Sequence, residues 1–248
     1  MLVQFEITTR CNFDCFYCAG RAMRQGDMSY EVFIDLLARH VERNGTPDTV
    51  SLQGEGEPTL HHDFFKMAAH VTGLGSKPYT ITNGTYKHPE RFAEHFSEVG
   101  VSIDTLEEAA AERIGRYNLP RVLSFIAALA PSVHIVVHSV AHREHTPKIA
   151  AWCRQNKYRH IVQSLQTKPD YTFRYAKHLQ PINPVGGFSC DYVASSRMRY
   201  YSLDGVEMPC CFIKDTSAYE GMEAMRAHQR DRTWPKVCAG CRYAKSLA

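Results

Sequence analysis

The sequence predicts a mixed α/β fold in which parallel strands form an open or curled sheet. Short runs rich in β-branched and aromatic residues recur along the first two thirds of the chain, and stretches of helical periodicity lie between them. Strand and helix alternate about six times, which is the order that builds a parallel sheet. The glycine-rich and polar motifs directly follow the predicted strands, where parallel α/β folds place their active sites.

The predicted elements follow one another without interruption up to about residue 164. The first strand lies at the N-terminus, where Val3, Phe5 and Ile7 alternate with polar residues. The first helix covers residues 30–43, with apolar side chains at helical spacing. The other strands are predicted over residues 49–52, 78–82, 99–103, 133–140 and 159–164, and the other helices over residues 62–72, 89–96, 107–114, 120–129 and 147–156.

A different pattern begins after this region. Residues 167–188 contain several prolines and glycines and are interpreted as a linker between a domain of residues 1–166 and a small unit of residues 189–248. In the small unit, Asp204 and Gly205 separate two β-rich runs and predict a hairpin. A short helix is predicted over residues 218–228.

The composition is that of an ordinary globular protein. Lysine and arginine number 29 against 26 aspartate and glutamate residues, without a dense basic stripe, so we expect no nucleic-acid partner. No apolar run of about 18 residues predicts a membrane span, and the basic start and apolar core of a signal peptide are missing. We therefore expect a cytoplasmic protein, in which the nine cysteines are more often metal ligands than disulfide partners.

Three cysteines follow the first predicted strand in the stretch CNFDCFYC, at positions 11, 15 and 18. Three thiolates can hold three irons of a [4Fe–4S] cluster and leave the fourth iron open for an outside ligand. The alternative is a zinc site completed by Asp14 or a distant histidine. Zinc sites usually combine two closely spaced pairs of Cys or His ligands that are separated by a modest stretch of sequence. The next such pair begins only at Cys238.

These motifs, taken together, resemble those of the radical S-adenosylmethionine (SAM) superfamily. The aromatic Tyr17 precedes the last cysteine of the trio, and LQGEGEP at residues 52–58 is similar to the glycine-rich turn of that family. TNGT at 82–85 and VSIDT at 101–105 are similar to its third and fourth strand ends. The resemblance implies a partial (βα)6 barrel, a [4Fe–4S] cluster, and SAM that is cleaved to a 5′-deoxyadenosyl radical. It also implies an external one-electron donor such as flavodoxin or ferredoxin.

The resemblance also implies roles for individual residues. The cluster ligands would be Cys11, Cys15 and Cys18, and the methionine amino group of SAM would lie at the turn made by Gly54, Glu55, Gly56 and Glu57. Tyr17 is expected at the adenine, Ser102 in contact with SAM, and Arg113, in preference to Arg116, as the arginine of the site. Four residues are placed by their strand-end position alone and serve either a ligand or the local turn: Asn83, Asp104, His138 and Ser139.

A second group of cysteines lies in the small unit, at Cys190, Cys210, Cys211, Cys238 and Cys241. Considered alone, a CxxC pair with two further cysteines is equally typical of a zinc ribbon. Beside the first motif, the pattern resembles the twitch version of the SPASM extension. This resemblance implies a second, auxiliary [4Fe–4S] cluster held by Cys190, Cys210, Cys238 and Cys241. Cys211 would replace Cys210, line the substrate pocket as a thiol, or simply be buried.

The leading functional hypothesis is a radical SAM enzyme that oxidises a small polar metabolite, similar to the short twitch-domain dehydrogenase of aminocyclitol antibiotic biosynthesis. His138 and Arg113 are candidates for assisting loss of the substrate proton. The first alternative is a peptide-modifying enzyme that cross-links or epimerises a ribosomal precursor. A second is an epimerase that uses Cys211 as hydrogen donor, and a third is a zinc-stabilised binding protein without activity.

Overall fold

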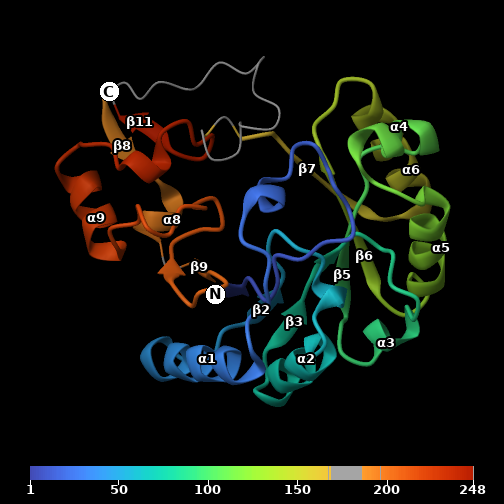
Figure 1. Cartoon of the computed structure of the whole chain (residues 1–248), viewed down its shortest axis with the longest axis horizontal. Helices are drawn as coiled ribbons and strands as arrows, with labels where there is room; N and C mark the ends of the chain where they lie inside the picture. Colours follow the sequence, from blue (N-terminus) through green and yellow to red (C-terminus); the bar gives the residue numbers. More distant parts are fainter. Residues whose placement is uncertain (167, 169–185, 196, 248) are drawn as a thin grey trace.

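The computed structural model describes residues 1–166, 168, 186–195 and 197–247 (Figure 1). A curled layer of strands with helices on its outer side forms the larger part of the molecule. Residues 186–195 and 197–247 form a smaller part that lies next to the first strand. Among the described residues, no helix is both long and apolar enough to cross a lipid bilayer.

The wall of the barrel consists of β1 (Leu2–Phe5), β2 (Thr49–Leu52), β3 (Lys77–Tyr79), β4 (Ile81–Thr82), β5 (Glu98–Ser102), β6 (His134–Val140) and β7 (Arg159–Gln163). All neighbouring strands are parallel, in the orders β1-β2-β3 and β4-β5-β6-β7. Together β3 and β4 are the strand predicted over 78–82, interrupted at Thr80. The Thr80 carbonyl still accepts a hydrogen bond from Gly100 N (2.9 Å), so the layer is continuous and confirms the predicted partial barrel.

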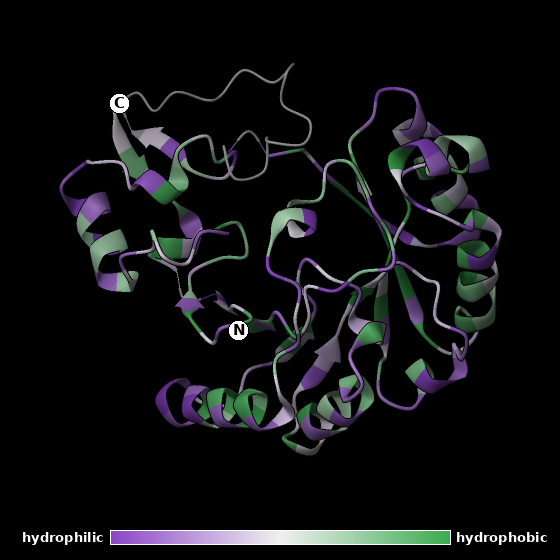
Figure 2. Cartoon of the chain, in the orientation of Figure 1, coloured by the Kyte–Doolittle hydropathy of each residue, from purple (hydrophilic) through white to green (hydrophobic). Residues whose placement is uncertain are grey.

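The outer helices are α1 (Tyr30–Asn44), α2 (Phe64–Gly73), α3 (Glu90–Ala93), α4 (Glu108–Ile114), α5 (Leu119–Leu129) and α6 (His145–Asn156). Local chemistry explains where they begin. Ser29 Oγ accepts a hydrogen bond from Val32 N (3.2 Å) at the start of α1, and Asn118 caps α5 in the same way. Apolar and polar residues alternate along these helices (Figure 2), because one face of each packs on the strands. The helix predicted over 89–96 is only one turn, α3.

The strands divide their side chains between the core and the lumen of the barrel. In β1, Val3 and Phe5 are fully buried, and Phe5 packs on Phe33 of α1 with ring centroids 4.9 Å apart. The residues between them, such as Gln4, line the lumen. This period of two follows from the pleat of the strand, and it gives the barrel an apolar outer face and a more polar interior.

The smaller part contains β8 (Gly187–Ser189), α8 (Asp191–Ala194), β9 (Met198–Tyr201), β10 (Glu207–Met208), α9 (Met222–Arg230) and β11 (Lys245–Leu247). The hairpin predicted at Asp204 and Gly205 is present between β9 and β10, with Gly205 at a φ of 78°. The predicted helix begins later than expected, after Gly221.

The two predicted units share a sheet. β9 pairs in parallel with β1, so the order of the first sheet is β10-β9-β1-β2-β3. The sequence pattern did not indicate this pairing, because β9 and β1 are separated by nearly the whole chain. The proposed boundaries at 166 and 189 therefore stay a prediction. Most of the predicted linker, residues 167 and 169–185, lies outside the described residues.

Candidate active site at the carboxyl ends of the strands

A cavity of about 1130 Å³ occupies the lumen of the barrel. At one end it is lined by the three thiols of residues 11–18, here called the three-thiol loop. It reaches to the opposite ends of the strands, where Leu2, Thr49 and Glu98 begin β1, β2 and β5. Side chains of the smaller part close one side of the cavity. The motifs that the sequence placed at strand ends are thus brought together around one space.

The three-thiol loop is held by its own backbone and by the end of α4. Cys18 N donates to Cys15 O (3.0 Å), and Asp14 N donates to Gly115 O (3.0 Å). Burial raises the pKa of Cys11 and Cys15, and it raises that of Cys18 to about 12. The protein groups alone therefore do not stabilise thiolates here. A bound cation would, because a metal ion deprotonates the thiols that coordinate it.

Gly115 permits the close contact between α4 and the three-thiol loop. Its φ is 91°, and a Cβ atom at this position would lie 2.1 Å from the carbonyl oxygen of Asp14. Only glycine fits such a position without displacing the loop. The sequence analysis did not single out this residue, although a glycine directly after a predicted helix is a known C-terminal signal.

The glycine turn, residues 54–57, packs against the chain that follows β1. A Cβ at Gly54 would lie 2.4 Å from Glu6 Cγ, and one at Gly56 would lie 2.4 Å from Arg10 O. The expectation was that glycine lets the backbone approach a ligand. All four residues of the turn do line the cavity, but the close approaches seen here are to the protein itself, to the Glu6 side chain at Gly54 and to backbone at Gly56. Gly56 N donates to Thr8 O (3.2 Å) as part of this packing.

Glu57 connects the glycine turn to the end of β4. Its buried carboxylate accepts hydrogen bonds from Thr82 Oγ1 (2.7 Å) and from Asn83 N (2.6 Å). Burial raises the pKa of Glu57. Asn83 in turn donates from Nδ2 to Asn12 Oδ1 (2.7 Å) in the three-thiol loop. Glu57 and Asn83 therefore connect the segments that follow β1, β2 and β4 around the cavity.

Tyr17, Asp104 and Arg116 form a buried polar group below Cys15. The Asp104 carboxylate accepts hydrogen bonds from the Tyr17 hydroxyl and from Val140 N, and it pairs with Arg116 Nε at 2.5 Å. Burial alone would lower the pKa of Arg116, but Asp104 and Tyr17 outweigh it and raise this pKa above its ordinary value. Arg116 is thus fixed as a cation beside the three-thiol loop.

The structure reverses the preference for Arg113 over Arg116. Arg113 lies in the last turn of α4 and is exposed, outside the cavity lining, whereas Arg116 lines the cavity and donates to Ser102 O (3.2 Å). The cause of this difference is local. The chain turns back at Gly115, so Arg113 lies before the turn and Arg116 lies after it, where the chain enters the site. Ser102 lines the cavity as expected, and Asp104 acts through Arg116 and Tyr17.

Neighbouring residues of β6 face opposite sides. His138 lines the cavity, and its Nε2 lies 2.8 Å from the hydroxyl of Tyr79. Burial, together with the charges of Arg159 and His160, lowers the pKa of His138 to about 4. At neutral pH this ring is therefore uncharged. Ser139 points away from the cavity and bonds to His160 at 2.7 Å, which corrects its assignment as a cofactor contact.

The second thiol set consists of Cys190, Cys210, Cys238 and Cys241, and all four are buried. Burial raises the pKa of Cys190 and Cys210, and nearby thiols add to the rise: Cys241 for Cys190, and Cys238 and Cys190 for Cys210. The four thiols therefore lie near one another. Cys211 also raises the pKa of the adjacent Cys210, but it lines the barrel cavity, where its own charged neighbours are Lys214 and Glu55.

Neither group of thiols has the spacing of a zinc site. Four thiolates around one zinc ion lie roughly 3.8 Å apart, since Zn–S bonds are about 2.3 Å long and tetrahedral. Among the described residues, the groups of three or more potential ligands within 4.8 Å of one another contain no cysteine. An iron–sulfur cube holds its thiolates further apart, and the three thiols of the three-thiol loop fit such a cube with one iron left open.

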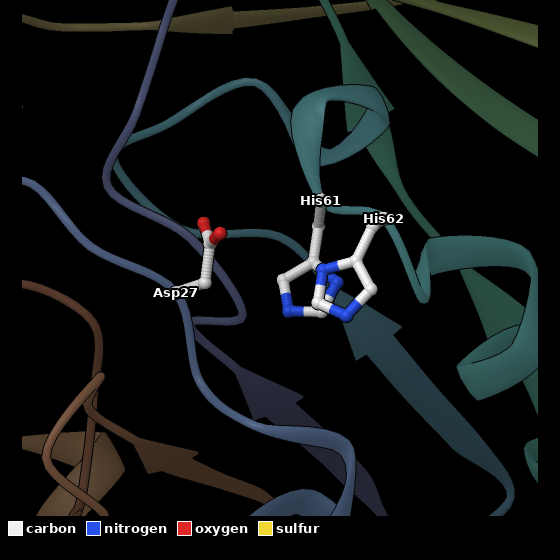
Figure 3. Close-up of side chains that lie close together, drawn as sticks. All are labelled: Asp27, His61 and His62. Carbon is white, nitrogen blue, oxygen red and sulfur yellow. The ribbon is translucent and has the colours of Figure 1, made fainter.

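One such close group is Asp27, His61 and His62 (Figure 3). His61 Nε2 lies 2.7 Å from the carbonyl oxygen of Met28 and must carry the hydrogen, while its Nδ1 accepts from Asp63 N (3.0 Å). The ring has no lone pair left for a metal ion. Asp27 accepts hydrogen bonds from Thr8 and Arg10, so the group is structural. The other group is Glu107, Glu144 and His145, whose carboxylates pair with Lys148.

The comparison with protein families matches residues 5–152 to the radical SAM superfamily. The chain belongs to this superfamily. Membership implies SAM and a [4Fe–4S] cluster, and the three-thiol loop is the part of this radical SAM protein whose donors fit that cluster.

Named relatives place this radical SAM protein among enzymes of different chemistry. It is 25% identical over 154 residues to the S-adenosylmethionine-dependent nucleotide dehydratase of Selenomonas ruminantium, with 56% of this chain and 55% of the relative covered. The chain spans about half the length of the first curated relatives it matches.

Two solved structures share the fold. SuiB of Streptococcus suis bound to S-adenosylmethionine has a TM-score of 0.69 at 14% identity, with coverage of 96% of this chain and 66% of SuiB. BtrN in complex with AdoMet and 2-DOIA has a TM-score of 0.57 at 14% identity, with coverage of 93% and 87%. At these identities the likeness concerns the fold alone.

Proposed function

We propose that this radical SAM enzyme oxidises a small polar metabolite by removing two hydrogens, and that the second thiol set holds an auxiliary [4Fe–4S] cluster. The observation that carries the proposal is the arrangement of the cysteines around one cavity. The three-thiol loop lines one end of this cavity, and the second thiol set is buried next to the segment that closes its side. When bound, the two clusters and SAM supply a radical that removes one hydrogen atom and an acceptor for the electron released afterwards.

The chain itself offers His138 as an acceptor for the remaining proton. His138 lines the cavity and is uncharged at neutral pH, and its Nε2 lies 2.8 Å from the Tyr79 hydroxyl. Because burial lowers its pKa to about 4, His138 would bind this proton only weakly. In the proposed reaction an H–C–O–H group of the substrate becomes C=O: one hydrogen atom leaves, the oxygen loses its proton to a base such as His138, and one electron departs.

The character of the cavity supports a small polar substrate. Gln4, Gln53, Tyr79, His138 and Gln163 place polar groups within mostly apolar walls. Four acidic and four basic side chains line it, so no excess of positive charge favours a polyphosphate. SuiB was solved with a precursor peptide, and one curated relative is a nucleotide dehydratase. The class of substrate is therefore part of the proposal. A cytoplasmic location and a flavodoxin- or ferredoxin-type electron donor belong to it as well.

The test uses deuterated water and the metabolite that stimulates 5′-deoxyadenosine formation. Oxidation predicts a product two mass units lighter than the substrate and one 5′-deoxyadenosine per turnover. A product of unchanged composition with one solvent deuterium on carbon would replace the oxidation by epimerisation. This second candidate is favoured by the position of Cys211, whose thiol lines the cavity as a hydrogen donor would.

A further inference from the structure

A buried ion pair joins the smaller part of the molecule to the three-thiol loop. Lys214 follows Cys210 by four residues, and its side chain is only 5% exposed. Its ammonium group pairs with Oε1 of Glu55, in the glycine turn after β2. The sequence analysis assigned no role to Lys214 and treated Glu55 only as part of the turn.

The other oxygen of the same carboxylate contacts the three-thiol loop. Glu55 Oε2 accepts a hydrogen bond from Gly20 N (3.2 Å) and lies 3.6 Å from Cys18 Sγ. The packing is tight, because a Cβ atom at Gly20 would lie 2.5 Å from Glu55 Cβ. One carboxylate therefore touches a cysteine of the first motif with one oxygen and a lysine of the smaller part with the other.

The negative groups around the Glu55 carboxylate make the positive charge of Lys214 important. Glu6, which is 1% exposed, accepts a hydrogen bond from Glu55 N (3.2 Å) and another from Leu203 N (3.3 Å). Two carboxylates thus lie close together, one of them buried and the other largely so, and Glu55 lies beside Cys18, whose thiol is negative whenever it binds metal. Like charges repel in a poorly solvated site, and a buried carboxylate whose partner is removed is strongly unfavourable.

We propose that Lys214 couples the smaller part to the first cluster site. Lys214 neutralises the charge of Glu55 beside Cys18. The three-thiol loop therefore binds its cluster and SAM with full affinity only when residues 210–214 are packed against it. Lys214 is a positioning residue in this proposal. The inference rests on membership of the radical SAM superfamily and goes beyond the proposed reaction, since it holds for any substrate and with or without an auxiliary cluster.

The test measures SAM binding to the reconstituted full-length protein by electron paramagnetic resonance. Only a cluster with an open iron changes its signal on adding SAM, so the titration reports the first site alone. Lys214→Met is expected to weaken SAM binding by at least about tenfold. Its first cluster is also expected to have a more negative midpoint potential, because a nearby positive charge is lost. Lys214→Arg keeps the charge and is expected to retain most of the affinity.

Because Glu55 lies in the glycine turn, Glu55→Gln is measured alone to give the contribution of the carboxylate itself to SAM binding. The double variant Lys214→Met with Glu55→Gln is expected to bind SAM as Glu55→Gln does, since without the carboxylate the lysine has no charge to neutralise, and it keeps the test decisive if Lys214→Met does not fold. The matched control is Arg24→Met, which removes an exposed ion pair with Asp204 between the same two parts of the molecule. Its SAM affinity is expected within about twofold of the wild type. The proposal is overturned if Lys214→Met binds SAM as the control does, or if Lys214→Met weakens SAM binding equally in the wild type and in Glu55→Gln.

Discussion

At the scale of single residues, Gly115 makes the sharpest prediction about the three-thiol loop. Gly115→Ala places a methyl group against the Asp14 carbonyl at 2.1 Å, in a backbone conformation that alanine rarely adopts. We expect a loss of about 3 kcal/mol or more in stability, together with lower iron content. Gly75→Ala is the control, because Gly75 has a φ of 78° with no atom within 4 Å. If both variants lose only about 1 kcal/mol in denaturant unfolding, the close contact at Gly115 is not tight.

Arg116 and Arg113 provide a second test at the same scale. Arg116→Met leaves the buried Asp104 carboxylate without its cation, which costs about 3–5 kcal/mol in comparable buried pairs. Arg113→Met removes an exposed charge and is expected to change stability by less than about 0.5 kcal/mol. Thermal unfolding and 5′-deoxyadenosine formation both check this difference. Equal effects of the two substitutions would contradict the assignment of Arg116 to the site.

At the scale of elements, local patterns predicted most of the barrel. Helical and strand periodicity located β2 (Thr49–Leu52) without error and the other strands and most of the helices to within a few residues. The interruption at Thr80 was not visible, because its cause is a contact with distant residues: Thr80 Oγ1 donates to Leu52 O (2.7 Å). The parallel pairing of β9 with β1 was missed for the same reason. Periodicity reports which face a residue occupies and not which strand lies beside it.

The elements also explain which site residues could be predicted. His138 and Ser139 are adjacent in β6, so the pleat allows only one of them to face the lumen, and a stricter use of strand alternation would have excluded Ser139. The choice between Arg113 and Arg116 depended on where α4 ends, and helix ends are the least certain part of a sequence-based assignment. The pair of Glu55 and Lys214 had no local signal at all, since it forms across the tertiary structure.

At the scale of the whole molecule, the cysteines divide between the two parts that meet at the cavity. Four belong to the barrel, namely the three of the three-thiol loop and the buried Cys153 of α6; four are buried in the smaller part, and Cys211 faces the cavity between them. The sequence alone assigned Cys210 as the ligand and left open whether Cys211 replaces it. In the structure Cys210 lies near Cys238 and Cys190 as well as Cys211, whereas Cys211 lines the cavity, so the proposal keeps Cys210 as the ligand.

This division predicts the iron content of the protein. Anaerobic reconstitution should give about eight irons per chain, since each four-iron cube takes one group of thiols. Replacing Cys11, Cys15 and Cys18 together by alanine should leave about four irons and abolish SAM cleavage. Replacing Cys190 and Cys210 should also leave about four, but with the SAM-responsive resonance signal retained. Cys211→Ala and Cys153→Ala are the matched controls, because neither residue belongs to a ligand group, and both should keep about eight irons. A wild-type count near four, accompanied by bound zinc, would show that the second thiol set holds zinc and would remove the electron acceptor from the proposed oxidation.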